Sequence, residues 1–205
     1  MIAIVDYDAG NIKSVEKALI LLGEEVVVTR DRDTILAADG VILPGVGAFG
    51  DAMDKLNSYG LSDVLREVAD KNIPFLGICL GLQLLFESSE ESPEAKGLGI
   101  LKGKVTRLPE VGLKIPHIGW NNLKFPHKGR LFKDIPEDTY VYFVHSFYLQ
   151  AADESIVTAT SEYAATIHAS VEQGNVFATQ FHPEKSSDMG LKMLKNFVDI
   201  ANGEY

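Results

Sequence analysis

A cysteine between two glycines is the clearest sign of chemistry in this chain. Cys79 follows a short apolar run, residues 75–78, precedes a helical pattern, residues 80–86, and is framed by Gly77 and Gly81. This G-x-C-x-G spacing is that of a nucleophile elbow with sulfur in place of the serine oxygen. A strand that turns directly into a helix crowds the backbone, so we expect only residues without a Cβ atom beside the nucleophile. The first helical N–H groups would then face the sulfur and favour its thiolate form.

A reactive cysteine needs a base, whereas an inert one is simply a small apolar residue of the core. A thiol nucleophile in acyl transfer requires an imidazole within hydrogen-bond reach and a carboxylate or amide to orient it. Among the five histidines, His182 directly follows an apolar strand pattern at 176–181 and is followed by Pro183 and Glu184. We therefore expect Cys79, His182 and Glu184 to form a catalytic triad.

A second glycine pattern, GVGAFG at 45–50, matches the G-x-G-x-x-G of dinucleotide sites. It follows the third expected strand rather than the first, and no later strand ends in an acidic residue about 20 positions on, as such sites require. Backbone N–H groups in this segment could instead stabilise an oxyanion. We expect no nicotinamide or flavin cofactor and no metal.

An aromatic-rich run, VYFVHSFYL at 141–149, is preceded by the isolated segment PHIGWN at 116–121. Aromatic-rich strands usually serve packing. His145, Ser146 and Phe147 interrupt the apolar alternation with polar groups, which could line a site for a small polar substrate.

Composition narrows the class of protein. A length of 205 residues with 46% hydrophobic content suits a single domain over residues 1–205, and the net charge of −10 argues against nucleic-acid and anionic membrane partners. One cysteine excludes an internal disulfide and any multi-cysteine metal site. The first ten residues lack the basic start of a signal peptide, and the longest mostly apolar stretch, residues 73–86, is too short to cross a bilayer. We expect a soluble, cytoplasmic protein.

Short apolar runs alternate with helical patterns along the first 90 residues. Strands are expected at 2–5, 26–29, 41–43 and 75–78, and helices at 11–22, with Asn11 as the cap, and at 61–71. This alternation predicts an α/β fold with an open, mostly parallel sheet flanked by helices on both faces. Ligands of such sheets bind at the carboxyl ends of the strands, where Asp6, Pro44 and Cys79 fall.

The pattern changes in the middle of the chain. Residues 98–108, 117–125 and 140–149 are β-like runs broken by glycine, proline and asparagine, which indicates antiparallel additions to the parallel core. Further strands are expected at 155–160, 164–170 and 176–180, and a last helix at 188–202, capped near Ser187.

Several stretches together resemble the class I glutamine amidotransferases. They are DYDAGN at 6–11, PGVGAF at 44–49, GICLGLQLL at 77–85, PHIGWN at 116–121, YFVHSFY at 142–148 and QFHPEKS at 180–186. The resemblance spans nearly the whole chain and implies a flavodoxin-like fold. Within the family, DYDAGN and PHIGWN are similar to the glutaminase subunits that serve histidine biosynthesis. Asp8 stands where many members have glycine, which concerns only the local shape of its loop.

The resemblance implies a role for each residue of the expected triad. Cys79 would attack the side-chain amide of glutamine, His182 would pass a proton to the leaving ammonia, and Glu184 would orient the imidazole. Water would then hydrolyse the glutamyl thioester to glutamate.

The family's other functional positions are also present. The oxyanion would be held by the N–H of Leu80 and by that of Val46, which lies between Gly45 and Gly47 and can point away until the partner is active. The positions that match the glutamine-binding residues are Gln83, His145, Ser146 and Phe147. The positions that match residues near the interface with the synthase are Asn11, Tyr142 and Lys185.

The resemblance also implies a protein partner. Free ammonia would be protonated in water and lost as a nucleophile, so it must pass directly to an acceptor site. The implied partner is a barrel-shaped cyclase subunit in a heterodimer. Three alternatives remain open: another class I amidotransferase, a stand-alone cysteine hydrolase with the same triad, and a dinucleotide-binding module in which Cys79 is inert.

Overall fold

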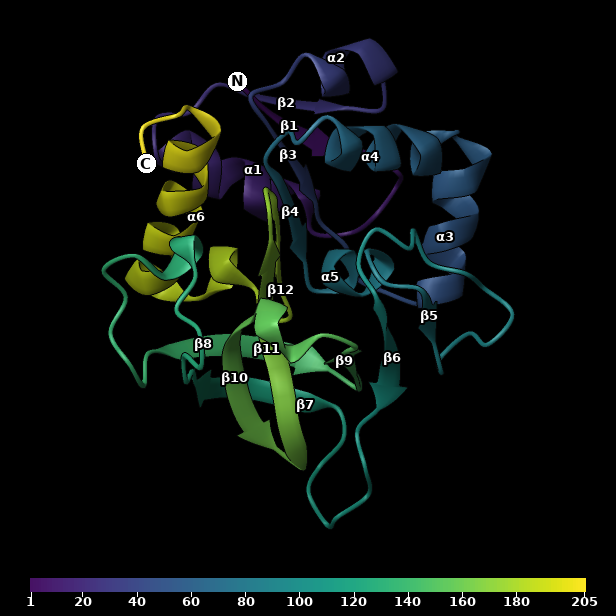
Figure 1. The fold of residues 1–205 in the computed structure, drawn as a ribbon, viewed down its shortest axis with the longest axis vertical. Helices are drawn as coiled ribbons and strands as arrows, with labels where there is room; N and C mark the ends of the chain where they lie inside the picture. The colour runs from purple at the N-terminus through teal and green to yellow at the C-terminus, as the bar shows by residue number, and fades with distance from the viewer.

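The protein is built around a seven-stranded sheet (Figure 1), and the computed structural model describes all residues from 1 to 205. The strand order is β10-β11-β12-β4-β3-β1-β2. The five strands from β12 to β2 run parallel, whereas β11 and β10 are antiparallel to their neighbours. The bounds are β1 (Ile2–Val5), β2 (Val26–Thr29), β3 (Gly40–Leu43), β4 (Phe75–Ile78), β10 (Val157–Tyr163), β11 (Ala165–Gln173) and β12 (Val176–Thr179).

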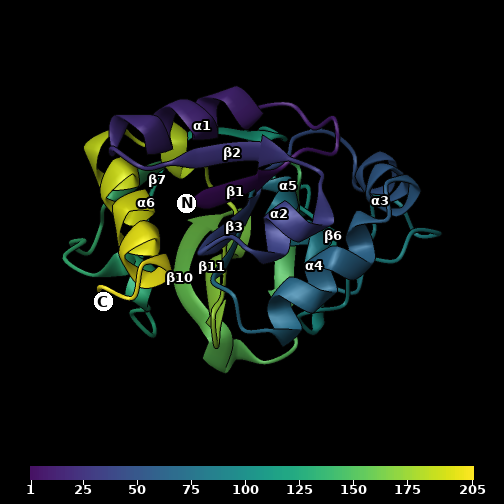
Figure 2. The same cartoon turned by 90° about the horizontal axis from the view of Figure 1, so that it is seen from above.

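Helices cover both faces of this sheet (Figure 2). One face carries α1 (Ile12–Leu21) and α6 (Ser187–Ala201), and the other carries α2 (Arg32–Leu36), α3 (Phe49–Ser58) and α4 (Leu61–Asp70). The parallel part, in the order β2-β1-β3-β4-β12, is the flavodoxin-like arrangement. The expected fold class is therefore confirmed.

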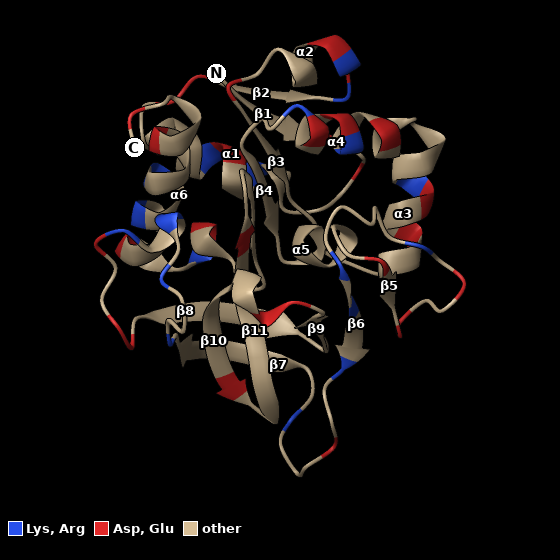
Figure 3. Ribbon diagram, viewed as in Figure 1, with Lys and Arg blue, Asp and Glu red and all other residues tan.

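The central strands are apolar throughout because both of their faces are covered. Successive side chains of a strand point to opposite faces. In β1, Ile2 and Ile4 pack in the cluster beneath α1 and α6, and Ala3 and Val5 pack in the cluster on the other side. Charged residues are confined to the helices, loops and outer strands, and β1, β3 and β4 contain none (Figure 3). No helix is long and apolar enough to cross a bilayer.

The expected antiparallel additions are present as two small sheets (Figure 1). One joins β5 (Ser88–Ser89), β6 (Gly103–Arg107) and β9 (Phe147–Ala151), and the other is the pair β7 (His117–Asn122) and β8 (Tyr140–His145). Both β6–β9 and β7–β8 are antiparallel. Residues 98–102, expected as strand, are irregular backbone with a bend, and the helices α2 and α3 were not expected.

Both expected helix caps are confirmed in position, to within one residue, but neither cap side chain bonds to the start of its helix. Asn11 precedes α1, but its side chain makes no capping hydrogen bond. Ser187 is the first residue of α6, and the hydroxyl of Ser186 before it donates to the carbonyl oxygen of His182 (2.6 Å) and accepts from the N–H of Tyr142 (3.0 Å). These polar side chains are engaged by residues around the expected triad instead of by the helix ends.

The turn from β4 into α5 (Leu80–Leu84) is as crowded as the glycine spacing predicts. Cys79 has φ 55° and ψ −106°, a backbone conformation that residues with a side chain rarely adopt. A Cβ atom on Gly77 would lie 2.8 Å from the backbone of Gly81, and one on Gly81 would lie 1.9 Å from the carbonyl oxygen of Leu43. α5 has only five residues, fewer than expected, so its macrodipole at the sulfur is small.

Gly81→Ala is therefore expected to lower the free energy of unfolding by about 2–3 kcal/mol or more, because the new Cβ would displace the backbone of β3. Gly60→Ala is the control, since Gly60 has φ 69° with open space around it and the change should cost only about 1 kcal/mol of backbone strain. Urea unfolding of both variants measures the difference. Equal losses in the two variants would contradict this account of the turn.

Candidate active site

The three residues of the expected triad lie at the carboxyl ends of the neighbouring strands β4 and β12. The N–H of Cys79 donates to the carbonyl oxygen of Thr179 (2.7 Å), which fixes the elbow against the end of β12. His182 lies three residues beyond β12, and its own N–H donates to the carbonyl oxygen of Tyr142 (3.0 Å). Glu184 follows in a short 3-10 turn, and its Oε1 lies 2.7 Å from Nδ1 of His182.

The pair of His182 and Glu184 is completely removed from solvent. Both side chains are 0% exposed, and Nε2 of His182 has no hydrogen-bond partner. Burial lowers the pKa of His182, but the neighbouring Cys79 thiolate and the Glu184 carboxylate outweigh burial and raise this pKa to about 9. Because Nδ1 is used by Glu184, Nε2 is the ring nitrogen that remains for the sulfur.

Asn11 adds a contact to this pair that the sequence did not indicate. Its Nδ2 donates to Oε1 of Glu184 and lies 3.4 Å from Nδ1 of His182. The expected interface residue therefore also touches the buried acid–base pair. Two elements far apart in the sequence, the loop after β1 and the turn after β12, are joined by this contact.

The expected oxyanion segment has its peptide turned away from the sulfur. The N–H of Leu80 donates to the carbonyl oxygen of Gly45 (3.3 Å). In a trans peptide the N–H points opposite to the C=O, so the N–H of Val46 points away from Leu80. The hydroxyl of Tyr7 holds the preceding peptide by donating to the carbonyl oxygen of Pro44 (2.7 Å). The structure thus has one of the two expected oxyanion donors covered and the other reversed.

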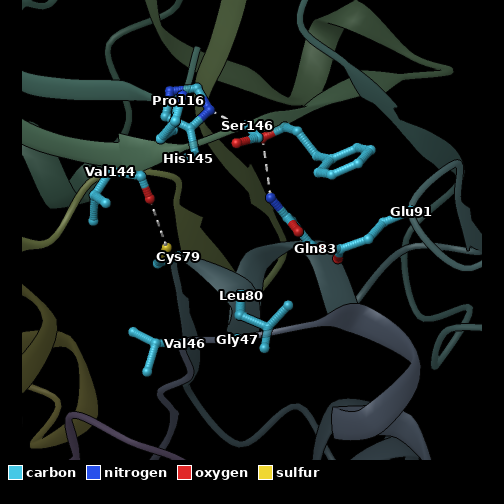
Figure 4. A pocket seen from close by; sticks show the side chains of 11 residues that line it. Val46, Gly47, Cys79, Leu80, Gln83, Glu91, Pro116, Val144, His145 and Ser146 are labelled. Atoms are coloured by element: carbon cyan, nitrogen blue, oxygen red, sulfur yellow. Dashed lines mark hydrogen bonds between the residues drawn. The ribbon is translucent and has the colours of Figure 1, made fainter.

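A cavity of about 310 Å³ opens beside Cys79 (Figure 4). This volume is at the lower end of the range for small-molecule sites. All four expected glutamine-binding residues line it, together with Val46, Gly47 and Leu80 of the expected oxyanion site. The lining residues are Val46, Gly47, Cys79, Leu80, Gln83, Glu91, Pro116, Val144, His145, Ser146 and Phe147.

Glu91 is a cavity residue that sequence reasoning missed. Its Oε2 accepts a hydrogen bond from the N–H of Phe49 at the start of α3 (2.9 Å). It lies in the stretch ESSEES at 87–92, which has the composition of an exposed loop. Its carboxylate gives the cavity a negative group that can accept hydrogen bonds from an ammonium group.

His145 reaches the cavity wall, but both of its ring nitrogens are used within the protein. Nδ1 donates to the carbonyl oxygen of Phe147 (2.9 Å), so Nε2 must accept, and it lies 3.0 Å from Nδ1 of His117. Burial lowers the pKa of both histidines to about 4, so both rings are neutral. The ring of His145 therefore holds the Phe147 segment in place and has no nitrogen left for a substrate.

Two of the expected interface residues lie on a second hollow next to the cavity. Asn11 and Lys185 line it, and Val46 borders both hollows. Tyr142 lies on β8, half-buried, with its ring 6.1 Å from that of Trp120. The expected oxyanion segment thus separates the cavity from the surface that carries the expected interface residues.

Asp8, the departure from the family pattern, is accommodated by charge. It adopts a left-handed φ of 60°, which explains why glycine is common there. Nη2 of Arg30 donates to the carboxylates of both Asp6 (2.9 Å) and Asp8 (2.8 Å), and the guanidinium lies over the ring of Tyr59. These contacts hold the loop in which Asn11 lies.

The chain matches known sequences over nearly its whole length. The family model for glutamine amidotransferase class-I matches residues 3–201. The imidazole glycerol phosphate synthase subunit HisH of Moorella thermoacetica is 55% identical over 200 residues, which cover 98% of this chain and 95% of that protein. The subunit of the same name from Aquifex aeolicus is 52% identical over 195 residues, covering 95% of this chain and 94% of its own.

Comparisons with solved structures show the same fold at lower identity. A crystal structure of a glutamine amidotransferase has a TM-score of 0.76 at 22% identity and covers 98% of each chain. The glutaminase domain of Trypanosoma brucei CTPS, with bound acivicin, has a TM-score of 0.70 at 19% identity and covers 100% of this chain and 94% of that one. On the extent of the family match and the identity to its relatives, this chain is a member of the class I glutamine amidotransferase family.

Proposed function

We propose that this chain is the glutaminase subunit of imidazole glycerol phosphate synthase. The observation that carries the proposal is the fully buried His182–Glu184 pair next to Cys79 at the end of the parallel sheet. Relatives that bear this subunit name are about half identical over nearly the full chain, which supports the assignment within the family. A biosynthetic enzyme of this kind belongs in the cytoplasm.

Glutamine binds in the cavity beside Cys79 with its side-chain amide toward the sulfur. Both hydrogen bonds of the Gln83 side-chain amide use Nε2, so its Oε1 remains available to the substrate. Glu91 supplies a carboxylate on the same cavity wall. Both groups are hydrogen-bond acceptors, which suits the α-ammonium group of glutamine.

The reaction follows from the protonation state of the pair. The raised pKa of His182 keeps the imidazole protonated at neutral pH, and the attack begins from this imidazolium with the sulfur of Cys79 as the thiolate. The sulfur of Cys79 attacks the amide carbon, and His182 gives its Nε2 proton to the departing nitrogen, which leaves as ammonia. Neutral His182 then takes a proton from water, the hydroxide attacks the thioester, and glutamate leaves as the sulfur recovers its electron pair. Glu184 stabilises the imidazolium before the attack and again when it re-forms.

The resting chain lacks a complete oxyanion site. The carbonyl oxygen of Gly45 occupies the N–H of Leu80, so a substrate oxyanion would meet a second oxygen instead of two donors. Rotation of the peptide between Gly45 and Val46 removes this oxygen and brings the N–H of Val46 to the site. The lack of a Cβ atom on Gly45 makes that rotation inexpensive.

The cyclase subunit docks on the surface next to this peptide. The hairpin of β7 and β8 exposes three large apolar side chains, Ile118 (53%), Trp120 (51%) and Tyr140 (60%), and Ile118 pairs with Val144, which lines the cavity. Exposed aromatic residues of this kind are common at protein interfaces. Ammonia passes from Cys79 to the partner, where it is used to form imidazole glycerol phosphate and aminoimidazole carboxamide ribotide. Asn11, Tyr142 and Lys185 lie at the edge of this contact.

Glutamate release decides the function. The isolated chain should release little glutamate from saturating glutamine, because its oxyanion site is closed, and should turn over when mixed with a cyclase subunit and its ribotide substrate. Cys79→Ala should abolish release in both conditions. Full activity of the chain alone would identify a stand-alone hydrolase, and silence in both conditions would indicate a different acyl substrate or another amidotransferase partner.

The pKa of His182 has a consequence for stability. This pKa, normally near 6.5, is about 9 in the folded chain, so the folded state holds the proton more tightly. The resulting stabilisation is fully present below pH 6.5 and is lost as the pH rises through 9. Relative to His182→Gln, the free energy of unfolding of the wild-type chain should fall by up to about 3 kcal/mol between pH 6 and pH 9.5. The free energies of unfolding are measured with urea at each pH. If the two proteins lose stability equally as the pH rises, His182 is not held as an imidazolium in the folded chain.

Trp120→Ala is expected to weaken binding of the cyclase subunit about tenfold or more, because a half-exposed aromatic side chain at the centre of an interface contributes strongly. Val111→Ala is the matched control, since Val111 is similarly exposed (58%) but lies on the loop between β6 and β7. Titration calorimetry measures both. Equal affinities for the two variants would move the docking surface away from the hairpin.

A further inference from the structure

A buried chain of hydrogen bonds runs from the cavity wall to the sulfur of Cys79. Nε2 of Gln83 donates to the carbonyl oxygen of Phe147 (3.1 Å) and to Oε1 of Gln180 (3.2 Å). Nε2 of Gln180 in turn donates to Sγ of Cys79 (3.8 Å), a distance within the range for a sulfur acceptor. Gln180 is 0% exposed and follows β12 directly. Neither the attack on glutamine nor the hydrolysis of the thioester, as proposed, uses this amide.

The donor and acceptor directions in this chain of hydrogen bonds are fixed at the end that lies at Phe147. The carbonyl oxygen of Phe147 can only accept, so the Gln83 amide must turn its nitrogen toward it (Figure 4). The same nitrogen also faces the side chain of Gln180, which must therefore accept the hydrogen bond with its Oε1. The nitrogen of Gln180 is left facing the sulfur. The reverse orientation of Gln180 would bring two N–H groups together and point an oxygen at Cys79.

The backbone holds both ends of this chain in place. The N–H of Gln180 donates to the carbonyl oxygen of Ala169 in β11 (2.8 Å). At the other end, Nδ1 of His145 donates to the carbonyl oxygen of Phe147 (2.9 Å). The amide of Gln180 therefore has little freedom to leave the sulfur.

The remaining neighbours of the sulfur act differently on its two protonation states. The carbonyl oxygen of Val144, 3.9 Å from Sγ, can accept from a thiol but offers nothing to a thiolate. Among the titratable groups, the His182–Glu184 pair lies on one side of Cys79. Tyr7, whose pKa rises through burial and through the charge of Cys79, lies near it, and the neutral His145 lines the same cavity. The Gln180 amide is the uncharged donor for the thiolate, and hydrogen bonds to ionised acceptors are the stronger ones.

We propose that Gln180 is a further catalytic residue, whose side-chain N–H stabilises the Cys79 thiolate before attack, and that Gln83 is the positioning residue that fixes its orientation. The proposal rests on the proposed glutaminase reaction. The two buried amides thus connect the cavity wall that binds the substrate to the ionisation of the Cys79 sulfur.

Alkylation of Cys79 by iodoacetamide tests this proposal without requiring glutaminase activity, and Cys79 is the only cysteine of the chain. The alkylation rate of the isolated chain is measured against pH for the wild type and for Gln180→Leu. Loss of the donor should move the midpoint of the profile upward by about half to one pH unit, which is about a threefold to tenfold slower reaction at pH values below the wild-type midpoint. Gln150→Leu, a change of an exposed glutamine on β9, should leave the profile unaltered.

Gln83→Leu provides a second variant that leaves the Gln180 amide in place but removes its anchor. Its midpoint should move in the same direction by a smaller amount. An unmoved midpoint in folded Gln180→Leu would overturn the proposal, and if that variant does not fold, an unmoved midpoint in Gln83→Leu would do so. In the complex with the cyclase subunit, Gln180→Leu should lower kcat with KM for glutamine unchanged, whereas a purely structural change would leave kcat at its wild-type value once the variant is folded. A wild-type complex without glutaminase activity would refute the proposed function but not the alkylation result.

Discussion

The steric constraint at the end of β4 determines the rest of the site. The chain turns from strand to helix within one residue, with Cys79 at φ 55° and the backbone of Leu43 so close to Gly81 that no side chain fits. This turn sets the sulfur above the edge of the sheet, where the ends of β12 and β3 also arrive. His182 and the Gly45 peptide are neighbours of the sulfur because their strands are neighbours of β4. The order of the strands therefore determines which groups lie next to the sulfur.

Much of the fold could be predicted, and a triad could be proposed, because their signals are local or strongly periodic. The apolar runs of β1, β3 and β4 and the glycines around Cys79 are such signals, and both are confirmed. The position of His182 near a strand end could also be predicted, since the apolar run VFATQF stands directly before it. Helix α3 was missed because its first turn overlaps the glycine pattern at 45–50, which suggested a loop.

The rest depends on contacts between distant segments, which no local pattern reports. Glu91 belongs to an acidic, serine-rich stretch, and only the approach of α3 makes it a cavity residue. Asn11 and Ser186 have the residue types of helix caps, yet their side chains bond around His182 and Glu184. Gln180 stands two residues before the expected base, and only its burial against Gln83 and Cys79 shows that its amide faces the sulfur.

The hydrogen bond from the N–H of Leu80 to the carbonyl oxygen of Gly45 has a consequence for a chain that is without its partner. On the proposed function, the protein's own oxygen occupies the place of the substrate's oxygen, like an inhibitor that is part of the polypeptide. A chain that is made in excess, or that loses its partner, remains in this state and spares the cell's glutamine. Errors of assembly therefore produce idle subunits and not ones that consume glutamine without making product.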